Sequence, residues 1–206
     1  MQKILNKLKK ALIIFLKYPE IGKCKTRLAT SIGEAKSLKV YKELLLHTNL
    51  ISNDLKVYKF LFYDKSSTKK MTWCKDNYQI AYQIESDLGG RMQHAFEQLF
   101  SQGYQNIVII GSDCYELTQN IIEQAFIDLK DHQATIGPAK DGGYYLLGLS
   151  EMRPELFKNI AWSTDKVYQS TTEILQSLGI NYSVGPILSD IDTVDDLTDK
   201  LKLLIK

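Results

Sequence analysis

Short apolar segments alternate along this chain with segments of helical periodicity, and this alternation constrains the fold more than any other feature. The apolar segments are rich in β-branched and aromatic residues, which is typical of buried strands. Helices that alternate with such strands are the signature of a layered α/β domain. Strands are predicted over residues 11–16, 56–63, 78–83, 106–110, 134–137, 144–149 and 181–184.

The helical segments place apolar residues three and four positions apart, so that each helix has one apolar face. Ser163 or Thr164 is expected to cap the helix that follows it, and Thr193 to cap the last helix. Asp195 and Asp196 then fall in the first turn of that helix, where the helix dipole favours negative charge. Helices are predicted over residues 35–48, 69–75, 92–100, 121–129 and 167–178, and after Thr193.

Size and charge indicate one domain, covering residues 1–206, that acts on a small partner. A chain of 206 residues with 44% hydrophobic content forms one sizeable core and is short for two. The charge is nearly balanced, with 26 Lys and Arg residues against 24 Asp and Glu residues. This balance argues against a protein that binds nucleic acid or a membrane surface.

Cysteine spacing and hydropathy indicate a soluble protein of a reducing cytoplasm. Cys24, Cys74 and Cys114 are too widely separated to suggest a zinc site or a disulfide framework. The apolar run 11–16 is too short for a signal peptide, and no segment approaches the roughly 20 apolar residues that span a bilayer.

A basic loop follows the first predicted strand, which ends before Pro19. Lys23, Lys25 and Arg27 alternate, so their side chains converge on one side if the loop is extended. Such convergence suits a polyphosphate, because Arg offers a bidentate fork, Lys a point charge, and Gly22 a close backbone approach. A solvated basic turn is the alternative. Neither the P-loop motif nor the dinucleotide fingerprint of three spaced glycines is present.

Three carboxylates stand where a ligand site is expected. Asp113 follows the strand over 106–110, and ligands of open α/β sheets bind at the carboxyl ends of the strands. Asp190 and Asp192 alternate around Ile191 before the last helix, so they share one side of the chain if it is extended. Helix capping explains neither of these two aspartates.

The segment Asp141-Gly142-Gly143-Tyr144 has two interpretations. It is typical of a tight turn into the strand over 144–149. Alternatively, the two glycines let a hydroxyl-rich ligand lie against the main chain, while Asp141 accepts hydrogen bonds from sugar hydroxyls.

Together these motifs resemble those of the DUF2064 family of glycosyltransferase-like proteins, in the family's order and over nearly the whole chain. The family carries Pro-x-x-Gly-x-x-Lys-Thr-Arg-Leu, Gly-x-Asp-x-Pro, Gly-Pro-x-x-Asp-Gly-Gly-Tyr-Tyr and Asp-x-Asp-Thr-x-x-Asp-Leu. This chain matches over residues 19–28, 111–113, 137–145 and 190–197. It departs at Tyr115, where the family usually has proline, so the resemblance leaves the shape of the turn after Asp113 open.

The resemblance implies a GT-A, or nucleotide-diphospho-sugar transferase, fold, in which helices flank both faces of a central, mostly parallel sheet. It also implies a glycosyltransferase that moves a sugar from a nucleotide-diphospho-sugar to a small-molecule acceptor. Two alternatives stay open. One is a nucleotidyltransferase similar to those that make molybdenum and deazaflavin cofactors, which releases pyrophosphate from a nucleoside triphosphate. The other is a nucleotide-binding or interaction domain without turnover. The base, sugar, acceptor, stereochemistry and oligomeric state are left undetermined.

The resemblance also implies roles for individual residues. Asp113 and Asp192 are expected to bind a divalent metal, Mg²⁺ or Mn²⁺, that bridges the phosphates of the donor. Asp113 and Asp141 are the expected catalytic residues. Phosphate binding is expected mainly of Lys25 and Arg27. Supporting phosphate contacts are expected from Lys17, Gly22 and Lys23, and the sugar or acceptor side is expected to consist of Asp141, Gly142, Gly143 and Tyr144.

Overall fold

The protein is described by a computed structural model, which covers residues 9–64 and 77–206. Its strands are β1 (Ala11–Leu16), β2 (Tyr58–Tyr63), β3 (Tyr78–Tyr82), β4 (Ile107–Ile110), β5 (Ala134–Pro138), β6 (Tyr144–Leu149) and β7 (Tyr182–Val184). Within the described residues they form one seven-stranded sheet in the order β3-β2-β1-β4-β6-β5-β7. Neighbouring strands are parallel except at β6, which runs antiparallel to β4 and β5. The expected mostly parallel sheet is therefore confirmed.

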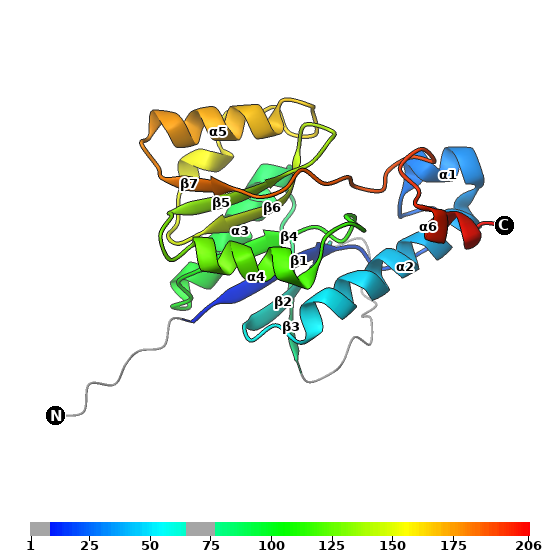
Figure 1. The fold of residues 1–206 in the computed structure, drawn as a ribbon, viewed down its shortest axis with the longest axis horizontal. Coiled ribbons are helices and arrows are strands. Elements are labelled where there is room, and N and C mark those ends of the chain that lie inside the picture. The colour runs from blue at the N-terminus through cyan, green and yellow to red at the C-terminus, as the bar shows by residue number, and fades with distance from the viewer. Residues whose placement is uncertain (1–8, 65–76) are drawn as a thin grey trace.

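Helices cover both faces of the sheet, which gives the three layers that the sequence predicts (Figure 1). In β1, Leu12 and Ile14 point to one face and Ala11 and Ile13 to the other, and all four are fully buried. The first face packs against α1 (Thr26–Ile32), α2 (Glu34–Asn53), α4 (Gln119–Asp128) and α6 (Asp199–Leu203). The second face packs against α3 (Leu88–Ser101), the 3₁₀ helix η1 (Pro154–Phe157) and α5 (Val167–Ser177). Among the described residues, no helix has the length and apolar character needed to cross a membrane.

The seven predicted strands are all present close to their predicted bounds, but the basic loop is shorter than predicted. Thr26 and Arg27 belong to α1, which is not evident from the periodicity, and Gly33 separates α1 from α2. A glycine suits this junction because its φ of +83° lies in the left-handed region. The helix predicted over 69–75 and Cys74 lie outside the described residues.

The starts of α3 and α5 differ from the predicted ones. α3 begins at Leu88, and the Asp87 carboxylate caps it by accepting the Gly90 N–H at 2.7 Å. Gly89 and Gly90 therefore lie in the first turn of α3. α5 has no side-chain cap, so the prediction that Ser163 or Thr164 caps it is wrong.

The last helix also begins later than predicted. Thr198 caps α6 by accepting the Leu201 N–H at 3.4 Å, so Thr193 is not its cap. Thr193 and Asp196 instead belong to a separate hydrogen-bonded turn before the helix. A threonine followed by acidic residues is compatible with a helix cap and with a turn, because a short polar side chain can form hydrogen bonds with the backbone of either.

One edge of the sheet collects the segments that carry the predicted site residues. The carboxyl ends of β1, β2, β3 and β4 meet at this edge because these strands are parallel. β6 begins at the same edge because it is antiparallel to β4. After β7 the chain crosses to α1 and α6, which lie at the same end of the molecule (Figure 1). The topology therefore brings the basic loop, Asp113 and the segment before α6 together.

Candidate functional site

A cavity of about 730 Å³ opens at this edge of the sheet. The residues after β1 and β4 line it, together with the start of β6, the first turns of α3 and the segments before α5 and α6. It lies outside the carboxyl ends of the parallel strands, which is where open α/β sheets bind ligands. The predicted site residues that line it are Lys17, Lys25, Arg27, Asp113, Asp141, Gly143, Tyr144 and Asp192, and Asp190 also lines it.

Lys25 is the central cation of the site. It precedes α1 with a left-handed backbone (φ 50°, ψ 50°), and only 6% of its side chain is exposed. Its Nζ lies 2.8 Å from Asp192 Oδ1 and 3.1 Å from Asp113 Oδ1. Burial alone would lower the pKa of Lys25, but the two carboxylates outweigh burial and raise the pKa above its usual value. Lys25 is therefore a permanent positive charge held between two aspartates.

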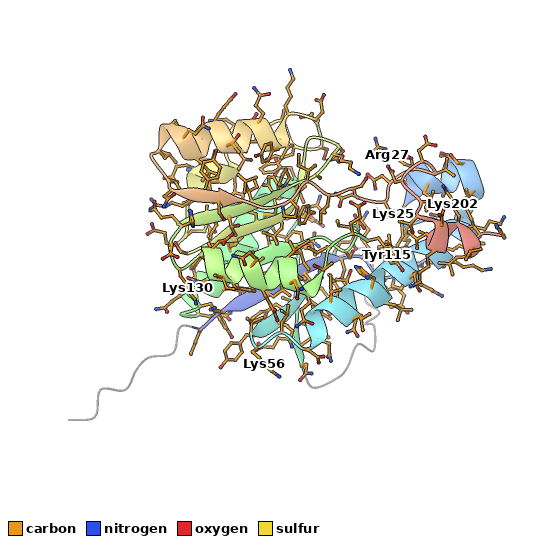
Figure 2. The ribbon with its side chains drawn as sticks, viewed as in Figure 1. Lys25, Arg27, Lys56, Tyr115, Lys130 and Lys202 are labelled. Carbon is orange, nitrogen blue, oxygen red and sulfur yellow. The ribbon has the colours of Figure 1, made fainter. Side chains whose placement is uncertain are left out.

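Arg27 lies at the rim of the same cluster (Figure 2). Its Nη1 is 3.2 Å from Asp192 Oδ2, while 74% of its side chain is exposed. The structure thus brings together Lys25, Arg27, Asp113 and Asp192, as the motifs predict. Partly exposed ion pairs contribute little to the stability of a protein, so stability does not explain why these four charged side chains lie together. Clusters of charged groups in a cleft are typical of ligand-binding sites.

The rest of the basic loop does not join the cluster. Lys23 Nζ pairs with Glu20 Oε2 at 3.3 Å in an exposed turn, and Lys23 does not line the cavity that the described residues enclose. Gly22, with φ +74°, supports this turn and also lies off the cavity. The predicted phosphate contacts of Lys23 and Gly22 are therefore not supported, because the loop is coiled rather than extended.

Tyr41 of α2 ties the ends of β1 and β4 together beneath the site. Its hydroxyl accepts the Lys17 N–H at 2.8 Å and donates to the Lys17 carbonyl at 3.1 Å. The same hydroxyl lies 3.5 Å from Ser112 Oγ. Burial raises the pKa of Tyr41 well above its usual range, so the phenol stays neutral. Because these bonds engage the backbone N–H and carbonyl of Lys17, Lys17 can contact a ligand through its side chain.

The segment before α6 is held against the turn after β4. Ile191 N–H donates to the Asp113 carbonyl at 3.0 Å, and the Ile191 side chain is fully buried. The Asp196 carboxylate accepts the backbone N–H groups of Asp192 and Thr193 at 3.0 and 2.7 Å, and the Thr193 hydroxyl at 2.9 Å. These bonds fix the Asp192 backbone, so Asp192 faces Lys25 from a defined direction.

Asp141, Gly142 and Gly143 form the turn before β6, and Gly142 has a different role from the predicted one. Asp141 Oδ1 accepts the Gly143 N–H at 2.9 Å, which closes the turn. Gly142 has φ +87° and does not line the cavity; a Cβ placed there would lie 2.0 Å from the Asp165 carbonyl oxygen. The close approach that Gly142 permits is therefore to another segment of this chain rather than to a ligand.

Arg91 is a cavity residue that the sequence motifs do not single out. It lies one turn into α3, where its Nη1 donates to Gln83 Oε1 and its Nε to the Asp87 carbonyl, both at 3.3 Å. Gln83 is itself buried after β3 and donates to the Phe62 carbonyl at 2.9 Å. The sequence signal that could have indicated this pair is Gln83, a polar residue at the end of a predicted strand. Arg91 thus adds a further positive charge to the cavity wall, in addition to Lys17, Lys25 and Arg27.

Tyr115, which stands where the resemblance leads one to expect proline, makes side-chain contacts that hold the turn after Asp113. Its hydroxyl donates to Glu43 Oε1 of α2 at 3.2 Å, and its ring packs on His47 with centroids 4.6 Å apart. Lys200 of α6 lies 5.5 Å from the ring and pairs with Glu43 at 3.1 Å. Figure 2 labels Tyr115 beside α2. The turn that carries Asp113 is thereby fixed without a proline.

Comparison with known proteins shows which family this chain belongs to. Residues 49–164 match the model of the DUF2064 family, described as uncharacterized protein conserved in bacteria. The chain belongs to the DUF2064 family. A crystal structure of a candidate nucleotide-diphospho-sugar transferase from Desulfovibrio desulfuricans G20 is 32% identical to this family member, with a TM-score of 0.86 over 91% of this chain and 84% of that one.

More distant structures share the fold of this DUF2064 protein. The inositol-1-phosphate CTP transferase from T. maritima has a TM-score of 0.53 at 12% identity, over 96% of this chain and 95% of that one. The 4-diphosphocytidyl-2C-methyl-D-erythritol synthase from Anaerococcus prevotii DSM 20548 has a TM-score of 0.58 at 10% identity, with the same coverages. These likenesses support the nucleotide-diphospho-sugar transferase fold. No curated protein matches the chain.

Proposed function

We propose that this protein is a glycosyltransferase that binds a nucleotide-diphospho-sugar in the cavity and transfers the sugar to a small-molecule acceptor. The observation that carries the proposal is the buried Lys25 ammonium, held by Asp113 and Asp192 at the carboxyl edge of the sheet. The name of the Desulfovibrio relative supports the same donor class. A cavity of this size accommodates a ligand as large as a nucleotide-sugar.

In this transfer an acceptor hydroxyl attacks the anomeric carbon of the sugar. The bond from that carbon to the β-phosphate oxygen breaks, the nucleoside diphosphate leaves, and the hydroxyl proton passes to water. Negative charge grows on the leaving phosphate oxygen, and Lys25 and Arg27 neutralise it. The ion pairs that position Lys25 before substrate arrives reduce the reorganisation needed in the transition state.

The carboxylates beside Lys25 fit a divalent metal. Both carboxylates direct one oxygen at Lys25 Nζ, which already occupies the point where they converge, so a metal would bind beside Lys25 on the cavity side of these carboxylates and not between them. In the described part of the chain no three His, Cys, Asp or Glu side chains form a ready-made cluster, but Mg²⁺ commonly takes one or two carboxylates and completes its shell with water and substrate phosphates. Asp113 and Asp192 are thus the proposed ligands of Mg²⁺ or Mn²⁺, which when bound adds positive charge at the diphosphate.

The test is a panel of sugar nucleotides and nucleoside triphosphates, with Mg²⁺ or Mn²⁺, monitored by thermal shift and by product release. Stabilisation by a sugar nucleotide with release of a nucleoside diphosphate is expected. Release of pyrophosphate from a triphosphate would show nucleotidyl transfer instead. Binding without release, for every acceptor in the panel, would overturn the assignment as a transferase.

Lys25→Met and Lys23→Met form a matched pair for the phosphate contact. Lys25→Met is expected to weaken nucleotide binding about tenfold or more, because it removes a charged hydrogen-bond donor. Lys23→Met is the control, since Lys23 lies in the same loop but off the cavity. Equal affinities in calorimetric titrations of the two variants would contradict the role of Lys25.

A further inference from the structure

Residues 162–165 form a short segment that is packed tightly between two glycines. A Cβ at Gly89 of α3 would lie 2.2 Å from the Trp162 indole, and a Cβ at Gly142 would lie 2.0 Å from the Asp165 carbonyl oxygen. Three residues after the segment, Tyr168 N–H donates to the Gly142 carbonyl at 2.8 Å. The segment is therefore held at both ends by close backbone contacts that a larger residue would prevent.

The middle of this segment presents polar side chains to the cavity. Ser163, Thr164 and Asp165 are exposed and all line the cavity wall. The Thr164 hydroxyl is engaged, because it donates to the Ala161 carbonyl at 2.7 Å. Ser163 has φ +64°, a conformation that is costly for a residue other than glycine. The packing thus keeps Ser163 in a strained backbone with its side chain at the cavity.

Asp165 differs from Asp141 in what its carboxylate already binds. Asp141 Oδ1 accepts the Gly143 N–H and closes its own turn. No hydrogen bond or ion pair joins the side chains of Asp165 or Ser163 to any residue that the structure describes. Their acceptor and donor groups are therefore available to a ligand in the cavity.

The position and charge of the segment indicate which ligand it meets. It lies with α3 and α5 on one side of the sheet edge, whereas Lys25 approaches from the side of α1 and α2. The Asp165 carboxylate repels a diphosphate, so this wall does not suit the phosphates of the donor. A carboxylate next to a hydroxyl suits the hydroxyl groups of an uncharged polyol.

We propose that residues 162–165 form the acceptor-binding wall, in which Asp165 and Ser163 bind hydroxyls of a polyhydroxylated acceptor. This inference rests on the proposed function, because an acceptor is required only if the cavity transfers a group. It moves the main acceptor contacts from the Asp141 turn to the segment that packs against Gly142.

The test measures polyol and nucleotide binding separately. D-Glucose and myo-inositol are the polyol probes in saturation-transfer NMR, with and without uridine diphosphate and Mg²⁺. The variants are Asp165→Asn and Ser163→Gly, of which the second removes the hydroxyl while suiting the left-handed backbone. Lys166→Ala is the control, because Lys166 is adjacent and exposed but does not line the cavity.

Asp165→Asn and Ser163→Gly are expected to weaken polyol binding about tenfold and to leave uridine diphosphate affinity unchanged. The control variant is expected to bind both as the wild type does. Unchanged polyol binding by Asp165→Asn would overturn the inference, as would a wild-type protein that binds the nucleotide but neither polyol. A wild-type protein that binds the polyols but none of the panel nucleotides would instead count against the proposed function.

Discussion

Individual residues of the same type play different roles here because their surroundings differ. Lys23 and Lys25 are two positions apart, yet Lys23 pairs with Glu20 in solvent while Lys25 is buried between two aspartates. The left-handed backbone of Lys25 turns the chain into α1 and directs this side chain inward. Residue type determines the available charge, but burial and partners determine whether a ligand can use it.

Asp196→Ala is expected to destabilise the protein by about 1–3 kcal/mol and to weaken nucleotide binding, because it leaves the bonds that fix Asp192 unmade. Asp195→Ala is the matched control, since Asp195 is adjacent and exposed. Urea denaturation and calorimetric titration measure both effects. Equal results for the two variants would show that the turn does not position Asp192.

Acid should remove the contribution of Asp196 in the wild type. Burial alone would raise the pKa of Asp196, but its hydrogen bonds from Thr193 and Asp192 lower the pKa below its usual value. The folded pKa is depressed, so this contribution is complete above the unfolded pKa of about 3.9 and is lost as the pH falls through the folded pKa. The stability difference between wild type and Asp196→Ala should shrink in that range.

Asp190 should have the opposite dependence. Burial, and then the neighbouring charges of Asp113, Asp141 and Asp192, raise the pKa of Asp190 to about 7, although Lys25 opposes this. A raised carboxyl pKa means that the folded state binds the proton more tightly, so stability falls as the pH rises from about 4 to about 7. In buffer with a chelator, Asp190→Asn should be more stable than wild type at pH 8, by on the order of 1–3 kcal/mol, and similar at pH 4. A constant difference across that range in urea denaturation would contradict the shift.

At the scale of elements, the cavity depends on how closely three segments pack. Gly89 in the first turn of α3 and Gly142 before β6 both accept the segment 162–165 against their backbone. The start of α3 and the turn before β6 are thereby connected through a segment that belongs to neither. Packing of this kind leaves no room for added atoms, because protein interiors are close-packed.

Gly142→Ala is expected to destabilise the protein by about 2–4 kcal/mol, because it combines overpacking against Asp165 with a left-handed φ. Gly103→Ala is the matched control, with a similar φ of +83° but nothing within 4 Å of the added Cβ. It is expected to cost only about 1 kcal/mol. Equal midpoints in urea denaturation would show that Asp165 moves aside without cost.

At the scale of the whole molecule, the site joins distant parts of the chain. Lys25 and Asp192 are separated by 167 positions, and Asp113 lies between them in sequence. The parallel strands and the crossing from β7 to α6 place all three at one edge of the sheet. A ligand that contacts these residues therefore stabilises the complete fold rather than one segment.

A bound nucleotide with Mg²⁺ should raise the melting temperature of the whole protein in one transition. At 100 times the dissociation constant, binding contributes about 2.7 kcal/mol, which corresponds to roughly 5–10 °C for a chain of this size. Chelation, or Asp113→Asn, should remove the metal-dependent part of the shift in differential scanning fluorimetry. A shift that is the same with and without chelator would rule out the proposed metal.

The class of fold and the types of chemical group in the site follow from the amino-acid sequence. Apolar segments such as 106–110 are buried strands, because their composition is a local property that burial requires. The motifs also predicted that Lys25, Arg27, Asp113 and Asp192 act together, and the structure brings these four side chains into one cluster. Such patterns are visible in sequence because each is fixed by a few neighbouring residues.

Which residues of each motif face the cavity depends on tertiary packing and is not visible in the motifs. In the structure, Lys23 and Gly142 do not line the cavity, whereas Arg91 and Asp165 do. Thr193 belongs to a turn around Asp196 and does not cap the last helix. Each of these outcomes depends on a contact with a segment far away in sequence or on a choice between local hydrogen bonds of similar energy. Local periodicity carries no information about such contacts, because they exist only once the sheet and its helices have packed.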